Sequence, residues 1–133
     1  MRYLLLIGLE GPIEDHFDAI DEDSIDWAVE TDDVEPWLQS MAGRDVRLIG
    51  SRLALPEQAV TIRRRDGELL RTDGPYAETK EWIAGFDLIE CKDMDEAIEI
   101  ASSHPVADFG QIEIRPLMPQ PWMKLRPYPG RLG

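Results

Sequence analysis

The chain has 133 residues, of which 43% are hydrophobic, values that are typical of one globular domain and exclude a wholly disordered chain. No apolar run approaches the ~20 residues of a membrane-spanning helix, and a single cysteine, Cys91, cannot form an intramolecular disulfide. The formal net charge of −13 repels phosphate backbones, so direct binding to nucleic acid is not expected. We expect one cytoplasmic domain over residues 1–133, with no membrane contact.

The N-terminal part contains a short strand and a long acidic segment. Tyr3 to Ile7 form a nearly continuous apolar run, as expected for a central strand covered on both faces. The run is too short for a signal-peptide core. The segment at about 10–32 follows, rich in acids and without sustained periodicity, and we expect a surface excursion with one helical turn near Ile25 to Val29. A connection of this length is a candidate lid.

A helix is predicted from Asp33 to Gly43, because apolar residues there recur at the spacing of one helical face: Val34, Trp37, Leu38 and Met41. Asp32 or Asp33 would cap its start, and Pro36 would lie within its first turn. A strand is then predicted over Val46 to Leu53, interrupted at Gly50-Ser51.

A β-hairpin is predicted next, since Ala59–Arg65 and Glu68–Thr72 flank the turn sequence Asp66-Gly67. The basic run Arg63 to Arg65 would alternate between the faces of a strand and therefore form no continuous track for phosphates. It would instead protect an exposed edge. Glu81 to Glu90 read as another strand, apolar on both faces.

The C-terminal part contains a second helix and a last strand. Asp93 and Glu96 have the spacing of a capping box. The expected buried stripe is Met94, Ala97, Ile98 and Ala101. Pro105 would end this helix near His104, because a proline disfavours helical geometry in the residue before it. Gln111–Arg115 alternate as a strand, and the proline-rich tail from about 117 would be irregular.

The predicted order is strand, helix, strand, inserted hairpin, strand, helix, strand. This order indicates an α+β fold of the ferredoxin-like plan, with two helices on one face of a mixed sheet. The other face of the sheet would then be apolar and uncovered. Pairing with a second copy of the chain would cover it, so we expect a homodimer.

Asp73 to Glu81 form the most distinctive stretch, reading Asp-Gly-Pro-Tyr-Ala-Glu-Thr-Lys-Glu. It resembles the signature of the DGPF-motif branch of the YCII-related family, with Tyr76 in place of phenylalanine. The resemblance implies a ferredoxin-like fold that dimerises through its sheets, a dimeric α+β barrel. It also implies a His–Asp pair suited to proton transfer in a pocket near the dimer interface. Genes of this branch often lie beside sigma factors of the extracytoplasmic type.

The resemblance places Glu35 near the family's histidine position and His104-Pro105 at its aspartate-proline position. The candidate catalytic residues are therefore His104, Asp73 and Glu35, and the candidate binding residues are Tyr76, Lys80 and Arg52. Each has a structural alternative. Glu35 could be a first-turn acid, His104 a helix-end cation, and Asp73 a turn residue. The Glu78/Lys80 pair could be a surface ion pair, and His16 an exposed loop histidine.

Two functions are compatible with these residues. The first is a small cofactor-free enzyme, a lyase, isomerase or hydrolase, that carries out acid–base chemistry on a small organic molecule. Its pocket would lie between the sheet and the helices, with His104 at the mouth and little packing dependent on it. The alternative is a non-catalytic ligand-binding or accessory protein, with a sigma factor as a possible partner. No metal site is predicted.

Overall fold

The computed structural model describes residues 1–11, 34–75 and 81–118 with their side chains. Residues 27–33 are described by their backbone alone. Its main sheet has four strands in the order β2-β5-β1-β6: β1 (Arg2–Glu10), β2 (Arg47–Arg52), β5 (Glu81–Glu90) and β6 (Gln111–Pro116). Every neighbouring pair is antiparallel. The prediction of a mixed sheet is therefore wrong, because the two strands that flank each helix are separated by a third strand that runs the other way.

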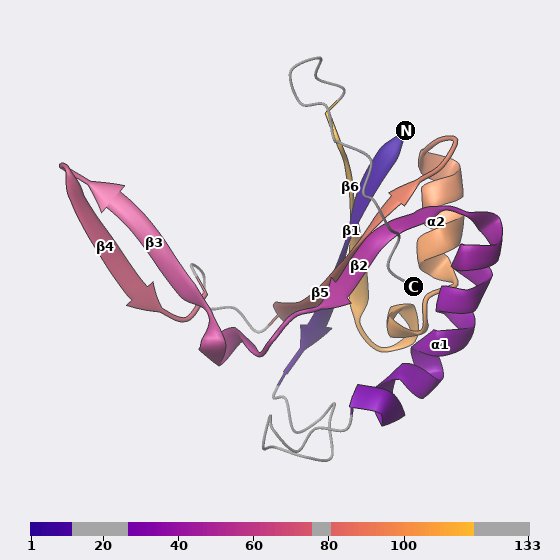
Figure 1. The fold of residues 1–133 in the computed structure, drawn as a ribbon, viewed down its shortest axis with the longest axis horizontal. Helices are drawn as coiled ribbons and strands as arrows, with labels where there is room; N and C mark the ends of the chain where they lie inside the picture. The colour runs from indigo at the N-terminus through magenta and orange to yellow at the C-terminus, as the bar shows by residue number, and fades with distance from the viewer. Residues whose placement is uncertain (12–26, 76–80, 119–133) are drawn as a thin grey trace.

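Helices α1 (Trp27–Arg44) and α2 (Met94–Ser102) both lie on one face of this sheet (Figure 1). The architecture is the predicted ferredoxin-like α+β fold. Side chains on the central strand β1 alternate between its two faces, and Tyr3, Leu5 and Ile7 point toward the helices. They form the core with a set of further buried residues: Trp37, Met41, Val46, Ile89, Cys91, Ala97, Ile100 and Ala101.

Helix α1 begins at Trp27, six residues before the predicted start. Asp32 and Asp33 are therefore inside the helix, and the prediction that one of them caps it is wrong. Acidic residues also suit the first turns of a helix, where they face the positive end of its dipole, so the acids alone did not mark the boundary. Pro36 lies inside the helix and not in its first turn. Trp37 and Met41 are buried, as predicted.

Strand β2 runs without a break from Arg47 to Arg52, so the predicted interruption at Gly50-Ser51 is wrong. The pairing of β2 with β5 is instead irregular before Gly50, because the register shifts between Arg47 and Ile49. Gly50 keeps its place in the ladder opposite Asp87.

The predicted hairpin is confirmed as β3 (Val60–Arg65) and β4 (Glu68–Asp73), which follow the short helix η3 (Pro56–Gln58). Asp66 and Gly67 have φ values of 50° and 79°, as a tight two-residue hairpin turn requires. The hairpin is a two-stranded sheet of its own and extends away from the main sheet (Figure 1).

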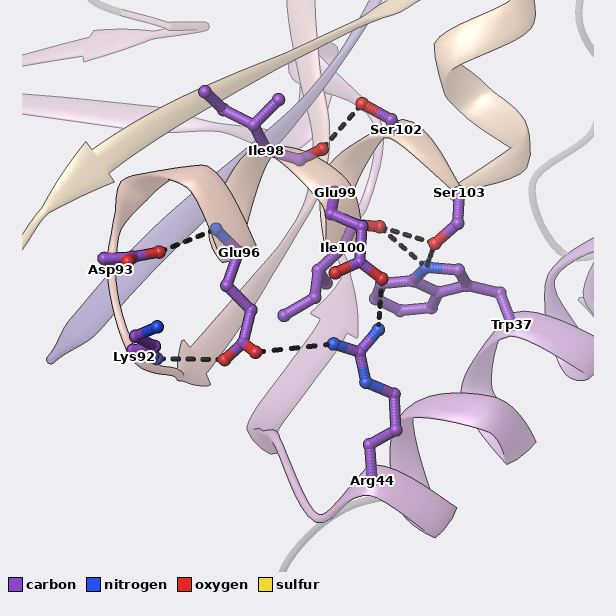
Figure 2. Close-up of polar contacts among 10 residues, drawn as sticks. All are labelled: Trp37, Arg44, Lys92, Asp93, Glu96, Ile98, Glu99, Ile100, Ser102 and Ser103. Atoms are coloured by element: carbon purple, nitrogen blue, oxygen red, sulfur yellow. Dashed lines mark hydrogen bonds and ion pairs between the residues drawn. The ribbon is translucent and has the colours of Figure 1, made fainter.

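Helix α2 has the predicted cap, since the Asp93 carboxylate accepts the Glu96 N–H at 3.0 Å. Glu96 in turn accepts the N–H of Lys92 and not that of Asp93. Arg44 at the end of α1 ties the two helices together through Glu99 at 3.0 Å and Glu96 at 3.8 Å (Figure 2).

Of the predicted buried stripe of α2, Ala97 and Ala101 are buried and Met94 is half-buried. Ile98 is exposed and Ile100 is fully buried with Ala97 and Ala101. The helix is short and ends at Ser102, so its apolar face lies closer to its C-terminus than the pattern suggested. The short helix η4 (Pro105–Asp108) leads into β6. No helix among the described residues is long and apolar enough to cross a membrane.

A buried polar cluster as candidate functional site

His104 stands at the junction between α2 and η4. Pro105 is the first residue of η4, and His104 before it adopts an extended backbone with φ −75° and ψ 135°. In this conformation its own side chain caps η4, because the imidazole Nδ1 accepts the N–H of Val106 at 3.0 Å. The local sequence His-Pro therefore fixes both the end of one helix and the orientation of the imidazole.

The His104 ring packs edge-on against Trp37 of α1, with ring centroids 4.6 Å apart and planes at 64°. Trp37 is itself held in place, since its Nε1 donates to the Ser103 hydroxyl at 3.0 Å and to the Ile100 carbonyl at 3.2 Å (Figure 2). His104 is only 5% exposed. His104 is part of the packed interior, so the expectation that little packing depends on it is wrong.

Burial, together with the nearby charge of Arg47, lowers the pKa of His104 from 6.5 to about 4. The imidazole is therefore neutral at pH 7, and the alternative reading of His104 as a helix-end cation is wrong. Because Nδ1 accepts a hydrogen bond from the backbone, the proton of the neutral ring sits on Nε2. Among the described residues no hydrogen-bond acceptor meets this Nε2–H group.

Arg47 of β2 and Asp87 of β5 form an ion pair on the same side of the sheet. The Arg47 Nε to Asp87 Oδ1 distance is 2.7 Å, with Asp87 buried and the Arg47 side chain 10% exposed. Burial raises the pKa of Asp87, while the hydrogen bond and charge of Arg47 pull it back toward its usual range. Gly50 lies opposite Asp87, and a Cβ there would overlap the Asp87 carboxylate and the Arg47 guanidinium.

The other predicted site residues are not brought to His104. Glu35 is exposed on α1, and its carboxylate accepts a hydrogen bond from Gln39 on the same helix at 3.4 Å. Asp73 is exposed at the end of β4, where it lies 3.9 Å from Arg71. Since β4 belongs to the projecting hairpin, Asp73 is far from the helix layer that holds His104 (Figure 1).

Arg52 is half-buried at the end of β2, two residues after Gly50 and therefore on the same face of the strand. Asp87 lies on this face too, because it pairs with Gly50. Arg52 is therefore on the same side of the sheet as the buried cluster. Tyr76, Glu78, Lys80 and His16 lie outside the described residues.

Arg47 and Asp87 were not among the predicted site residues, although the sequence contains a signal for one of them. Asp87 interrupts the apolar run of β5 between Phe86 and Leu88. A charged residue within a strand that is apolar on both faces must be buried and paired, and such groups are candidates for function. The identity of the partner could not be read, because the pairing depends on how β2 aligns with β5.

The described residues favour neither thiol chemistry nor a metal site. Cys91 is a buried residue just after β5, and burial raises the pKa of its thiol, with Glu96 as the next cause, so the thiolate is disfavoured. Within residues 1–11, 34–75 and 81–118, no group of three or more His, Cys, Asp and Glu side chains is placed to hold a metal ion.

The chain was compared with known proteins. The profile of the YCII-related domain matches residues 1–122. An uncharacterised protein of Rhizobium meliloti (strain 1021) is 44% identical over 69 residues, which are 50% of this chain and 56% of that protein. The match thus spans little more than half the length of this relative. The family match covers nearly the whole chain and agrees with the fold, and the chain therefore belongs to the YCII-related domain family.

Proposed function

We propose that the chain is a small enzyme that carries out acid–base chemistry on a carbonyl-containing organic molecule at the cluster of His104, Arg47 and Asp87. The observation that carries this proposal is the state of His104. Its ring is buried and neutral, its Nδ1 is engaged by a backbone N–H, and its Nε2–H meets no acceptor among the described residues. A buried donor without a partner is rare and calls for an explanation.

A ligand oxygen would satisfy that donor. A neutral imidazole whose pKa is lowered at a helix N-terminus can act as an electrophile that polarises a carbonyl group. In His104, burial and the charge of Arg47 lower the pKa instead, and the ring is neutral in the same way. Its Nε2–H would donate to the carbonyl oxygen, and the Arg47 charge nearby would favour the negative charge that develops on that oxygen.

Asp87 is the candidate proton acceptor of the cluster. A carboxylate with a raised pKa is a stronger base than an ordinary one, and its deprotonated form is kept available by Arg47. Removal of a proton from the carbon next to the carbonyl would give an enolate, with the proton on Asp87 and the negative charge on the oxygen held by His104. Return of a proton elsewhere would complete an isomerisation. This reaction is of the acid–base class expected from the sequence.

Exchange of substrate protons with solvent tests the proposal. The chain in D₂O is incubated with a panel of small 2-oxo acids and simple ketones, and deuterium incorporation next to the carbonyl is followed by proton NMR. We expect exchange above the buffer rate for at least one compound. We expect His104→Asn, which keeps an acceptor for the Val106 N–H but lacks Nε2–H, to lose about tenfold or more of it.

His16→Asn is the matched control, since it removes the other histidine of the chain. Exchange that survives in His104→Asn, or that is lost equally in His16→Asn, would contradict the proposal. Binding of a panel compound to His104 without exchange would instead support the non-catalytic alternative, a ligand-binding or accessory protein that could act beside an extracytoplasmic-type sigma factor.

We also propose that the working form is a homodimer joined through the sheet face away from the helices. That face carries apolar residues from three strands: Leu4, Leu6, Ile49, Phe86 and Leu88. Neither α1 nor α2 covers it (Figure 1). Most of these side chains are half-buried in the single chain, and a second copy would bury them further. The stretch from Asp73 to Glu81 supports placing the chain in the DGPF-motif branch of its family.

A further inference from the structure

Within the part of the chain that the structure describes, the β3–β4 hairpin makes few contacts with the main sheet. Among the described strands, β3 and β4 pair with each other and with no third strand, and the hairpin extends from the main sheet in the direction opposite to the helices (Figure 1). Its base is closed by two hydrogen bonds, from the Gly74 N–H to the Ala59 carbonyl at 2.7 Å and from the Thr61 hydroxyl to the Gly74 carbonyl at 2.8 Å. A two-stranded hairpin alone in water is marginally stable, so further contacts are needed.

The two faces of the hairpin differ in character. The pairing register places Val60, Ile62 and Leu69 on one face, with exposed fractions of 46%, 55% and 60%. The opposite face holds Leu70 as its only large aliphatic side chain among threonines and charged residues. The face of Val60, Ile62 and Leu69, hereafter the apolar arm face, is an exposed surface of the kind that marks a binding site.

The charge of the hairpin is opposite to that of the chain around it. Residues 60–73 contain four arginines and three acids, a net charge of +1, which leaves −14 on the other residues. Arg64 and Arg71 lie on the apolar arm face itself. Asp73 lies on the same face, 3.9 Å from Arg71, so two arginines and one acid give this face a net charge of +1. A partly apolar and weakly basic surface fits an acidic partner, and the described residues outside the hairpin contain more acids than bases.

We propose that the hairpin is an arm that binds a second copy of the chain, with the apolar arm face against it. The proposal rests on the homodimer proposed above, because a copy packed on the sheet face away from the helices lies on the side toward which the hairpin extends. Each arm would then bury Ile62 and Leu69 on the partner. Its arginines would meet the partner's acidic surface.

Sedimentation equilibrium of the full chain tests this arm. The dimer dissociation constant is measured for the wild type, for I62S/L69S on the apolar arm face, and for the matched control L70S on the opposite face. Circular dichroism checks that each variant is folded. We expect I62S/L69S to weaken the dimer by about tenfold or more and L70S to change it by less than about twofold.

A second pair of variants tests the charge. R64E/R71E reverses two arginines on the apolar arm face and R63E/R65E reverses two on the other, so both change the net charge equally. The first should weaken the dimer more. A dimeric wild type with I62S/L69S unaffected, or affected no more than L70S, would overturn the arm and leave the homodimer standing. A wild type that stays monomeric would overturn both.

Discussion

At the scale of single residues, a proline fixes the orientation of the imidazole that precedes it. Pro105 prevents His104 from continuing α2, the extended backbone lets the imidazole cap η4, and the cap turns Nδ1 toward a backbone donor. Trp37 then covers the ring. Each step reduces the space or the solvation that a second proton would need, and the outcome is a buried neutral imidazole.

The depressed pKa of His104 predicts how stability depends on pH. The folded pKa is about 4 and the usual value is 6.5, so between these values the unfolded chain binds more protons than the folded one. The free energy of unfolding should therefore fall as pH falls from 6.5 toward 4, by on the order of 3 kcal/mol from this group. Urea unfolding at a series of pH values measures it.

His104→Asn isolates that contribution. Asparagine can cap η4 but does not titrate, so the variant should lose less stability than the wild type over the same pH range. In both proteins Asp87 changes the free energy of unfolding in the opposite direction as pH falls. Its raised pKa lets the folded state keep a proton that the unfolded chain releases. Equal pH dependence of the two proteins would show that His104 is not the neutral buried group described above.

At the scale of elements, the alignment of β2 with β5 creates the buried ion pair. Gly50 stands opposite Asp87 and leaves the space that the Asp87 carboxylate and Arg47 occupy. The sequence suggested an interruption of the strand at this glycine. The structure instead keeps the strand intact and uses the missing side chain to accommodate two charged groups.

Gly50→Ala should be strongly destabilising. Its methyl group would overlap the Asp87 carboxylate and come within 2.9 Å of the Arg47 Nε. Displacement of one partner leaves the other charge buried without compensation, at a cost of about 3 kcal/mol or more. Gly43→Ala in α1 is the control, since nothing lies within 4 Å of its Cβ and alanine favours a helix by up to about 1 kcal/mol.

Thermal and urea unfolding measure both variants. A Gly50→Ala protein as stable as the wild type would mean that the pair has room to move and is not fixed by β2. A Gly43→Ala protein destabilised as much as Gly50→Ala would point to a general intolerance of added methyl groups.

At the scale of the whole molecule, α1 and α2 cover one face of the sheet, and the proposed association uses the other. That face carries Leu6 and Phe86 from the two central strands. The proposed homodimer places these residues at the interface. The hairpin arm would add contacts beyond this sheet-face interface.

Leu6→Gln should therefore shift the protein toward monomer. Sedimentation equilibrium at micromolar concentration should give about twice the 15.2 kDa chain mass for the wild type and a lower average for Leu6→Gln. Ile98→Gln, which changes an exposed aliphatic residue on α2, is the control and should stay dimeric. A Leu6→Gln protein that associates as tightly as Ile98→Gln would place the interface elsewhere.

Much of the fold could be predicted from the sequence, because its elements follow local patterns. The hairpin at Asp66-Gly67, the strand Glu81–Glu90 and the cap at Asp93 were predicted nearly residue by residue. Of the three residues of the candidate site, the sequence indicated only His104. Its burial, the pairing of Arg47 with Asp87 and the separation of Asp73 from both depend on packing between distant segments, which no local pattern encodes.

The most direct test of the account is the titration of His104 itself. The chain has two histidines, so ¹⁵N NMR of labelled imidazoles gives two sets of signals, and His104→Asn assigns them. We predict a midpoint near 4 for His104, with the proton of the neutral ring on Nε2. A midpoint at or above the ordinary 6.5, or a neutral ring protonated on Nδ1, would contradict the site described above.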